Sequence, residues 1–346
     1  MDASGRSSVV QAASRQIAET VQPAKGLMLA ADVGGTYARV GLVQTGASAP
    51  EMQRYHKYRC AEYPGLGAIL RHFLKESVDA PVAHGAIACA GYALDDVVIN
   101  TNLPWKVSLA QIRQDLGLSD LLLVNDFTAI AYATRYVRPH EVTSIASTEQ
   151  PLEGPILVVG PGTGLGAAVR IPGNGSTIIL STEAGQAALT ASTELEIEVL
   201  RYLLRNASHV PVEQVASGPG LSNLHAALCA IRGVRSQRLS PTQITAAAIE
   251  QREPLALEAL RVFCAWLGSV VGNLVLLYGA QGGVYLAGGI LPQIREFLLE
   301  SDFVERYRDK GAMRALMERV PVSLIEHGQL GVLGAAGWYL DQRRAP

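Results

Sequence analysis

Residues 29–43 read LAADVGGTYARVGLV, an apolar run, a glycine-rich turn and a second apolar run. Short apolar runs separated by glycine are typical of β-strands joined by a tight turn. The segment therefore predicts a hairpin with its turn at Gly34, Gly35 and Thr36. Glycines let backbone N–H groups approach an anion closely, and a threonine hydroxyl adds a further donor. We therefore expect an anion-binding loop, with Asp32 at the end of the strand that leads into it.

A second segment has the same plan. Residues 156–171 read ILVVGPGTGLGAAVRI, in which two apolar runs flank the turn Gly162-Thr163-Gly164. Thr36 and Thr163 are separated by 127 positions, which is the size of half the folded chain. A repeat at this spacing predicts two related α/β lobes, each offering a glycine-rich turn. Two such turns facing each other would form a cleft.

A carboxylate follows a third apolar run. Residues 121–133 read LLLVNDFTAIAYA, a buried-strand pattern followed by Asn125, Asp126 and an apolar helix pattern. Burying a charge is costly unless the charge is paired or used. One explanation is that Asp126 caps the helix, because Asp and Asn are favoured at that position. The other explanation is that Asp126 takes part in chemistry at the cleft.

The rest of the chain alternates strand and helix patterns from Leu27 onward. Ser108 is expected to cap a helix that Gly117 closes. Residues 262–280, VFCAWLGSVVGNLVLLYGA, are long enough to span a membrane, but glycines and Asn273 interrupt them, so we expect a buried helix. Residues 1–26 are polar and rich in small residues, and we expect them to form an extension outside the fold rather than a signal peptide.

Composition narrows the class of protein. Hydrophobic residues make up 49% of the 346 residues and charged residues 17%, which is typical of a globular protein with a large core. The net charge of −2 gives no electrostatic footprint for nucleic acid. The four cysteines form no C-x-x-C pair and no metal-ligand spacing. We therefore expect a cytoplasmic protein that binds neither nucleic acid nor membrane.

The residues that follow the glycines in the sequence exclude two common nucleotide-binding loops. A Walker loop needs a lysine directly after its glycine turn, and no lysine of this chain is so placed. Residues 162–167 match the G-x-G-x-x-A of a dinucleotide-binding fold, with Glu183 at a suitable distance. However, Pro172, Gly173 and Gly175 interrupt the segment where the crossover helix should run. The turn therefore opens a hairpin.

Several motifs together resemble the bacterial glucokinase family, in that family's order. They are DVGGTYARVGLV (32–43), VNDFTAIAYA (124–133), GPGTGLGAAV (160–169), SGPGLSNL (217–224), GGVYLAGGILP (282–292) and GVLGAAGWYL (331–340). The resemblance covers residues 27–345 and points to the group without a zinc signature, within the superfamily of sugar kinases, heat-shock ATPases and actin. It implies a two-lobed α/β fold of the actin-like or hexokinase-like ATPase type, with an inter-lobe cleft. The small lobe is expected to comprise 27–136 plus 329–346, and the large lobe 137–328.

The resemblance also implies an activity. Members of that family transfer the γ-phosphate of ATP, with Mg²⁺, to the 6-hydroxyl of D-glucose, giving ADP and the glucose 6-phosphate that enters glycolysis. Asp126 would be the base that takes the proton of that hydroxyl. The residues expected to bind the sugar are Asn102, Asn125, Glu183, Gln186 and Glu213. A homodimer is the assembly that the resemblance favours.

The nucleotide is expected to lie between the two glycine turns. Gly34, Gly35 and Thr36 would cradle one side of the phosphates, and Gly162, Thr163 and Gly164 the other. Gly288 and Gly289 would lie under the adenosine. Asp32 would approach Mg²⁺ through water, because magnesium keeps several of its waters.

One motif departs from the family pattern. The family has Glu-Gly-Gly-His where this chain has EAGQ at 183–186, so that Ala184 replaces a glycine and Gln186 replaces a histidine that bonds a sugar hydroxyl. Glutamine both donates and accepts hydrogen bonds, but it does not become charged. We therefore expect altered sugar affinity or preference. A kinase for another hexose, a weakly active or inactive sugar-sensing relative, and a donor such as polyphosphate or ADP all stay open.

Overall fold

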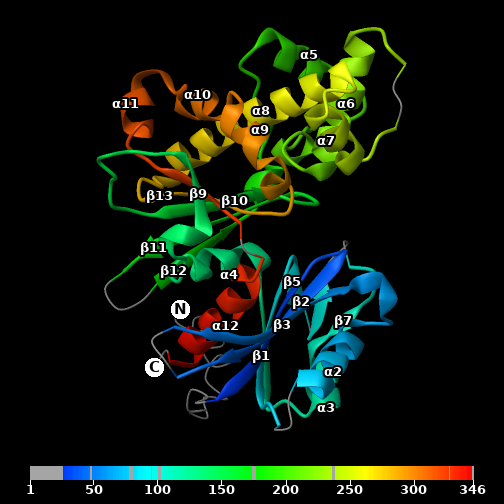
Figure 1. Cartoon of the computed structure of the whole chain (residues 1–346), viewed down its shortest axis with the longest axis vertical. Coiled ribbons are helices and arrows are strands. Elements are labelled where there is room, and N and C mark those ends of the chain that lie inside the picture. The colour runs from blue at the N-terminus through cyan, green and yellow to red at the C-terminus, as the bar shows by residue number, and fades with distance from the viewer. Residues whose placement is uncertain are drawn as a thin grey trace, which may run out of the picture.

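The computed structural model consists of two α/β lobes, one above the other in Figure 1. It describes residues 26–46, 49–77, 81–94, 96–99, 103–173, 177–235, 238–326 and 328–344. The expected extension, apart from Gly26, and the predicted sugar ligand Asn102 lie outside the described residues.

The small lobe is built on a five-stranded sheet of order β3-β2-β1-β4-β8. Its strands are β1 (Leu27–Val33), β2 (Tyr37–Gln44), β3 (Glu51–Arg59), β4 (His84–Cys89) and β8 (Asp120–Val124). Helices α2 (Leu66–Ser77) and α3 (Leu109–Leu116) pack on one face, and α12 (Leu330–Arg344) packs on the other. A small second sheet contains β5 (Tyr92–Leu94), β6 (Val97–Ile99) and β7 (Val107–Ser108).

The large lobe is built on a six-stranded sheet of order β12-β11-β10-β13-β14-β9. Its strands are β9 (Val142–Ala146), β10 (Ile156–Pro161), β11 (Leu165–Pro172), β12 (Thr177–Thr182), β13 (Gly283–Leu286) and β14 (Val322–Ile325). In both lobes an antiparallel three-stranded meander is followed by two parallel strands beside its first strand. This shared topology confirms the predicted repeat, and both glycine turns connect antiparallel strands as expected.

Helices cover the large-lobe sheet on the side away from the small lobe (Figure 1). They are α5 (Glu194–Leu203), α6 (Gly218–Ile231), α7 (Pro241–Ile249), α8 (Pro254–Tyr278), α9 (Arg295–Glu300), α10 (Phe303–Arg308) and α11 (Arg314–Met317). Short 3-10 helices lie at Cys60–Glu62, Pro139–Glu141, Ala184–Gln186, Val212–Gln214, Leu291–Ile294 and Gly311–Met313.

Helix α8 is the apolar segment that resembled a membrane span. Within the part of the chain that the structure describes, it is the one helix long and apolar enough for that, and 72% of its most apolar window is buried inside the protein. Its glycines permit close packing, because a Cβ at Gly268 would lie 2.2 Å from the carbonyl oxygen of Phe303. The segment is a core helix, as predicted.

Helix α4 (Asp126–Ala133) lies between the two lobes (Figure 1). On one side it crosses α12 so closely that a Cβ at Gly334 would lie 1.8 Å from the carbonyl oxygen of Ala129. On the other side Phe127 and Ile130 pack against the large-lobe sheet. The helix therefore presents its N-terminus where the lobes meet.

Candidate active site

The first turn of α4 explains why two polar residues follow a buried strand. Asn125 is the N-cap, and its Oδ1 accepts a hydrogen bond from the backbone N–H of Thr128 at 3.1 Å. Asp126 is the first helical residue, and its Oδ1 accepts from the N–H of Phe127 at 2.9 Å. Because Asn125 supplies the cap, capping does not account for Asp126.

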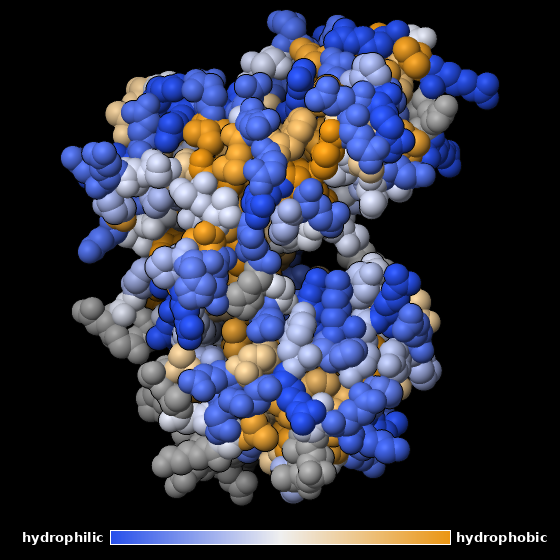
Figure 2. Space-filling view, in the orientation of Figure 1, coloured by the Kyte–Doolittle hydropathy of each residue, from blue (hydrophilic) through white to orange (hydrophobic). Residues whose placement is uncertain are grey.

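Asp126 lines two cavities and lies where they meet. The space-filling view shows a hollow between the two lobes on one side of the molecule (Figure 2). One cavity has a volume of about 400 Å³ and the other about 430 Å³. Asp126 and both glycine turns line the two of them. A group bound in one cavity would therefore meet a group bound in the other beside this carboxylate.

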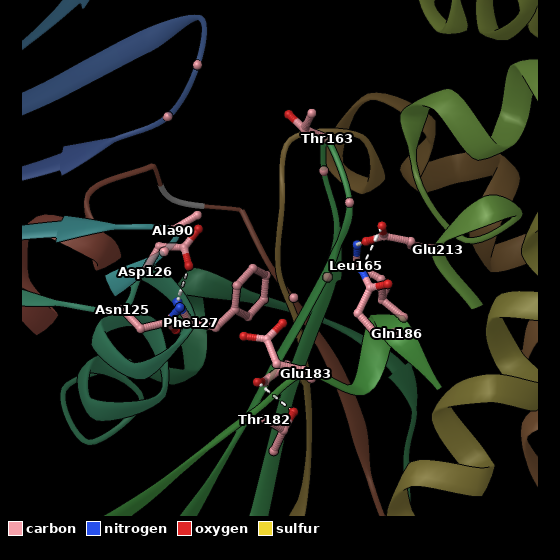
Figure 3. Close-up of a pocket in the computed structure, with 18 of the residues that line it drawn as sticks. Ala90, Asn125, Asp126, Phe127, Thr163, Leu165, Thr182, Glu183, Gln186 and Glu213 are labelled. Carbon is pink, nitrogen blue, oxygen red and sulfur yellow. Dashed lines mark hydrogen bonds between the residues drawn. The ribbon is translucent and has the colours of Figure 1, made fainter. Parts of the chain in front are cut away.

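The first cavity is rich in hydrogen-bond acceptors (Figure 3). Its wall carries the carboxylates of Asp126 on the small-lobe side and of Glu183 and Glu213 on the large-lobe side. Glu213 Oε1 accepts from the side-chain amide of Gln186 at 2.8 Å, and its Oε2 accepts from the N–H of Leu165 at 3.3 Å. Carboxylates so placed suit a ligand that donates hydrogen bonds from many hydroxyls.

The second cavity is lined by glycine turns. Within the first turn Gly34 N–H donates to the carbonyl of Tyr37 at 3.0 Å, and within the second Gly162 N–H donates to that of Gly164 at 2.8 Å. Gly288 has a φ of +96° and lies against the carbonyl of Pro161, so that a side chain there would be strained. Backbone at these glycines is open to close approach by a phosphate chain.

Asp32 is held by a partner that the sequence analysis did not single out. Asp32 and Arg39 are opposite each other in the β1–β2 register, and their side chains form a 3.2 Å ion pair. A Cβ at Gly331, in the first turn of α12, would lie 2.6 Å from Asp32 Cγ. Burial raises the pKa of the Asp32 carboxyl, and the Arg39 guanidinium opposes this rise. The hairpin register would have indicated Arg39, since a short turn fixes which residues face each other.

Phe127 is a second residue that sequence reasoning missed. Its ring occupies the place that a side chain at position 166 would take, because a Cβ at Gly166 would lie 2.0 Å from Phe127 Cδ2. The residue after Asp126 is thereby packed against the second hairpin. In addition, the Thr128 hydroxyl forms a 2.7 Å hydrogen bond with that of Ser181 on β12. These contacts tie the start of α4 to the large lobe.

The pKa of Asp126 suits a general base. Burial, and next to it the negative charge of Asp32, raise it from the ordinary value of 3.8 to about 6, although the hydrogen bond from the N–H of Phe127 opposes the shift. Glu183 adds a smaller increase. A carboxyl with this pKa is largely ionised near neutral pH and is a stronger base than an exposed aspartate.

The oxygen ligands suit a magnesium ion held mainly by water and phosphate. The second cavity is lined by the carboxylates of Asp32, Asp126 and Glu326. In the described ranges, no three His, Cys, Asp or Glu side chains are grouped closely enough to hold a metal directly. Magnesium prefers oxygen, keeps several waters and is bound by few carboxylates together with substrate phosphates. The residues present therefore fit this ion.

The structure brings together the predicted site residues that it describes. The first cavity is lined by Gly34, Gly35, Asn125, Asp126, Gly162, Thr163, Gly164, Glu183, Gln186 and Glu213. The second cavity is lined by the other four, Asp32, Thr36, Gly288 and Gly289, and it shares Gly34, Gly35, Asp126, Gly162 and Thr163 with the first. A two-lobed α/β protein with paired glycine turns, and with a carboxylate between an acceptor-rich pocket and a glycine-lined pocket, has the architecture of a sugar kinase.

Comparison with known proteins defines the family. The family model described as Glucokinase matches residues 29–342, and the chain belongs to this family. It is 52% identical to a glucokinase-like protein of Xylella fastidiosa, over 91% of this chain and 95% of that protein.

Solved structures of glucokinases have the same fold as this chain. A crystal structure of glucokinase from an Antarctic psychrotroph is 35% identical and has a TM-score of 0.79, covering 90% of this chain and 98% of that one. A ROK family glucokinase from Streptomyces griseus, solved in complex with glucose and AMPPNP, is 21% identical with a TM-score of 0.60, covering 90% and 99%. The two-lobed fold predicted from the sequence is confirmed.

Proposed function

We propose that this protein transfers the γ-phosphate of ATP to the 6-hydroxyl of D-glucose, giving glucose 6-phosphate and ADP for glycolysis. The observation that carries the proposal is the position of Asp126, whose carboxylate borders both the acceptor-rich cavity and the glycine-lined cavity. Membership of the glucokinase family supports the substrate pair.

In this proposal each part of the cleft has one task. Glu183, Glu213, Gln186 and Asn125 hold the sugar hydroxyls, so that the 6-hydroxyl faces Asp126. Asp126 accepts the proton of that hydroxyl as its oxygen bonds to the γ-phosphorus and the bond to the ADP oxygen breaks. Such transfer depends mostly on positioning and charge stabilisation. Asn125 Oδ1 is used by the helix cap, which leaves its amide N–H groups for the sugar.

The other residues of the cleft hold the phosphate donor. Gly34, Gly35 and Thr36 face its phosphates from one lobe and Gly162, Thr163 and Gly164 from the other, with Gly288 and Gly289 beside the nucleoside. Mg²⁺, held through water near Asp32, would supply charge neutralisation of the phosphates. Closure of the lobes 27–136 plus 329–346 and 137–328 would exclude water, which competes with the sugar for the phosphoryl group.

A second candidate is a sugar-binding regulator with little turnover. It is favoured by the hydrogen bond between Gln186 and Glu213, which already occupies a carboxylate oxygen that would otherwise accept from the sugar. A ligand has to replace or bridge this bond, and a mispaired hydroxyl weakens binding strongly. A kinase for a different hexose would differ in the same contacts.

The test is ADP release from Mg-ATP with and without glucose, for the native protein, Asp126→Asn and the control Asp115→Asn on α3. We expect glucose-dependent release that falls by about 100-fold to 10,000-fold in Asp126→Asn and is unchanged in the control. Calorimetric glucose binding without ADP release in the native protein would instead support the regulator. Release with another hexose but not with glucose would change the substrate.

The proposal includes the setting of the enzyme. We propose a cytoplasmic homodimer. A reducing compartment is supported by the four cysteines, which are all buried and form no disulfide bond: Cys60, Cys89, Cys229 and Cys264.

A further inference from the structure

The two lobes protect the edges of their sheets in different ways. β3 and β12 occupy corresponding edge positions, since each is the third strand of its meander. β3 has the sequence EMQRYHKYR with four charged residues, whereas β12 has TIILST with none. Natural sheets usually carry charges on exposed edges, because an uncharged edge is a template for pairing with another strand. Among the described residues no strand pairs with the outer edge of β12.

The side chains of β12 are also unusual for a surface strand. Ile178 is 61% exposed and Leu180 is 46% exposed. Ile179, between them, packs against the cluster that contains Phe127 and Ile130, so Ile178 and Leu180 point to the opposite face of the sheet. Figure 1 shows the β11–β12 hairpin at the margin of the large lobe. A strand with both a free edge and exposed aliphatic side chains is an interaction surface.

We propose that β12 pairs with β12 of a second copy of this chain, forming one continuous antiparallel sheet across a two-fold axis. The occupant is a second copy because the strand is complementary to itself. It carries no charge that would repel an identical strand, and its apolar pattern is nearly symmetric about Ile179. This interface specifies the proposed homodimer but is independent of the proposed kinase activity.

Alternation of side chains fixes the register. Residues directly opposite each other in an antiparallel pair point to the same face of the sheet. When a strand pairs with its own copy, an even-numbered residue must therefore lie opposite an even-numbered one, and an odd-numbered residue opposite an odd-numbered one. Centring the axis on Ile179 places Ile178 opposite Leu180 of the second copy, and Leu180 opposite Ile178. The exposed isoleucine of each copy is then covered by the exposed leucine of the other copy.

Neighbouring surface enlarges the contact. Ile178 is paired with Ile171 on β11, and Ile171 lines a groove of about 570 Å³ together with Leu152, Pro155 and Pro172. Six residues of strand pairing alone bury less than the ~1,600 Å² of a standard interface. The groove lies on the same face as Ile178 and provides further apolar area for the second copy.

The first experiment measures oligomeric state by sedimentation velocity, without sugar or nucleotide. The variants are Ile178→Lys and Leu180→Lys, which give β12 a charged edge like that of β3. The control is Leu277→Lys, at a leucine that is 77% exposed elsewhere on the surface. We expect a dimer for the native chain and the control, and a halved mass for both β12 variants, with unchanged circular dichroism. A native monomer overturns the proposal, as does a dimer that survives both lysines.

A second experiment tests the register. The native cysteines are buried, so an introduced cysteine is the accessible one. A mixture of Ile178→Cys and Leu180→Cys proteins should form a disulfide-linked dimer under mild oxidation, because these positions face each other in the proposed pairing. Either variant alone should cross-link much less. In such a dimer the two introduced cysteines, one from each copy, lie diagonally across the strand pair at about 7–8 Å. Equal cross-linking in all three samples would overturn this register.

Because neither experiment needs turnover, a failed dimer prediction and a failed kinase prediction give different results. A monomer that releases ADP with glucose would contradict only the proposed interface. A β12-dependent dimer that releases no ADP would contradict only the proposed activity.

Discussion

The β1–β2 hairpin brings a carboxylate to the cleft, whereas the β10–β11 hairpin brings none and instead makes room for its neighbours. Asp32 lies two residues before Gly34, where the first turn begins, and is paired with Arg39. In the second hairpin Gly160 lies against the carbonyl of Ala287, at 2.2 Å from the position of an added Cβ. Gly166 similarly accommodates the ring of Phe127. The same strand–turn–strand plan therefore brings a carboxylate to the cleft in the small lobe, whereas in the large lobe its glycines make room beside the cleft for Ala287 and Phe127.

Gly34 of the first hairpin and Gly166 of the second therefore have different roles. In the first turn, a Cβ at Gly34 would meet no described atom closer than 3.7 Å, which is ordinary contact. In the second hairpin, the space left by Gly166 fixes the residue next to Asp126. Gly166 therefore positions the residue next to Asp126, the proposed base, although it is far from both in sequence.

Among the substitutions that test this difference between the hairpins, Gly166→Ala is expected to have the largest effect on activity. The new methyl and the Phe127 ring cannot share the same space, so the start of α4 must shift. A displacement of about 1 Å can lower kcat by about 100-fold, and overpacking costs about 1–3 kcal/mol of unfolding free energy. The measurements are glucose-dependent ADP release and urea unfolding.

Gly34→Ala is the matched control in the first hairpin. Because the added methyl has room, we expect its unfolding free energy to stay within about 0.5 kcal/mol of the native value, whatever happens to nucleotide binding. Equal destabilisation by the two substitutions would show that the hairpins do not differ in the way described here.

The pH dependence of activity tests the effect of the Asp32 charge, on the first hairpin, on Asp126. Asp126 has a pKa of about 6, raised by burial and by Asp32 on the first hairpin. If its ionised form is the base, kcat/KM should fall about tenfold per pH unit below this value. A profile without this acid limb would contradict the assignment of Asp126 as base.

The same shift predicts an effect on folding. The folded-state pKa lies above the unfolded value of 3.8, so native stability decreases as pH rises between the two values and stays lower above about 6. Asp126→Asn should therefore stabilise the fold by about 1–2 kcal/mol near pH 8 and by almost nothing near pH 4. Urea unfolding at the two pH values measures this. Destabilisation at the higher pH would show that the charge of Asp126 is favourable to folding.

Much of this cleft was predictable because its parts are local in sequence. A glycine turn between two apolar runs specifies a hairpin, and its repetition specifies two lobes. Ser108 and Gly117 bound α3 as predicted, with Ser108 accepting from the N–H of Gln111 and Gly117 at a φ of +65°. Each of these features depends on interactions within a few residues.

The parts that could not be predicted depend on contacts between distant segments. Nothing near Phe127 indicates that its ring fills the space above Gly166, and nothing near Asp32 indicates that α12 begins against it. The hydrogen bond between Gln186 and Glu213 joins residues 27 positions apart. The motif comparison identified Gln186 as a departure, but only the folded chain shows which group it contacts.

That contact carries the smallest of the predicted effects. In Gln186→Ala, Glu213 keeps the N–H of Leu165 and loses its side-chain donor. If Gln186 also bonds the sugar, KM for glucose should rise about 3-fold to 10-fold with little change in kcat, as expected for one hydrogen bond of about 1 kcal/mol. A lower KM in the alanine variant would instead mean that the Gln186–Glu213 bond competes with glucose, and steady-state kinetics distinguishes the two. Gln186→His, which introduces the histidine of the Glu-Gly-Gly-His pattern described in the sequence analysis, then tests whether a ring donor at this position binds glucose better than the amide does.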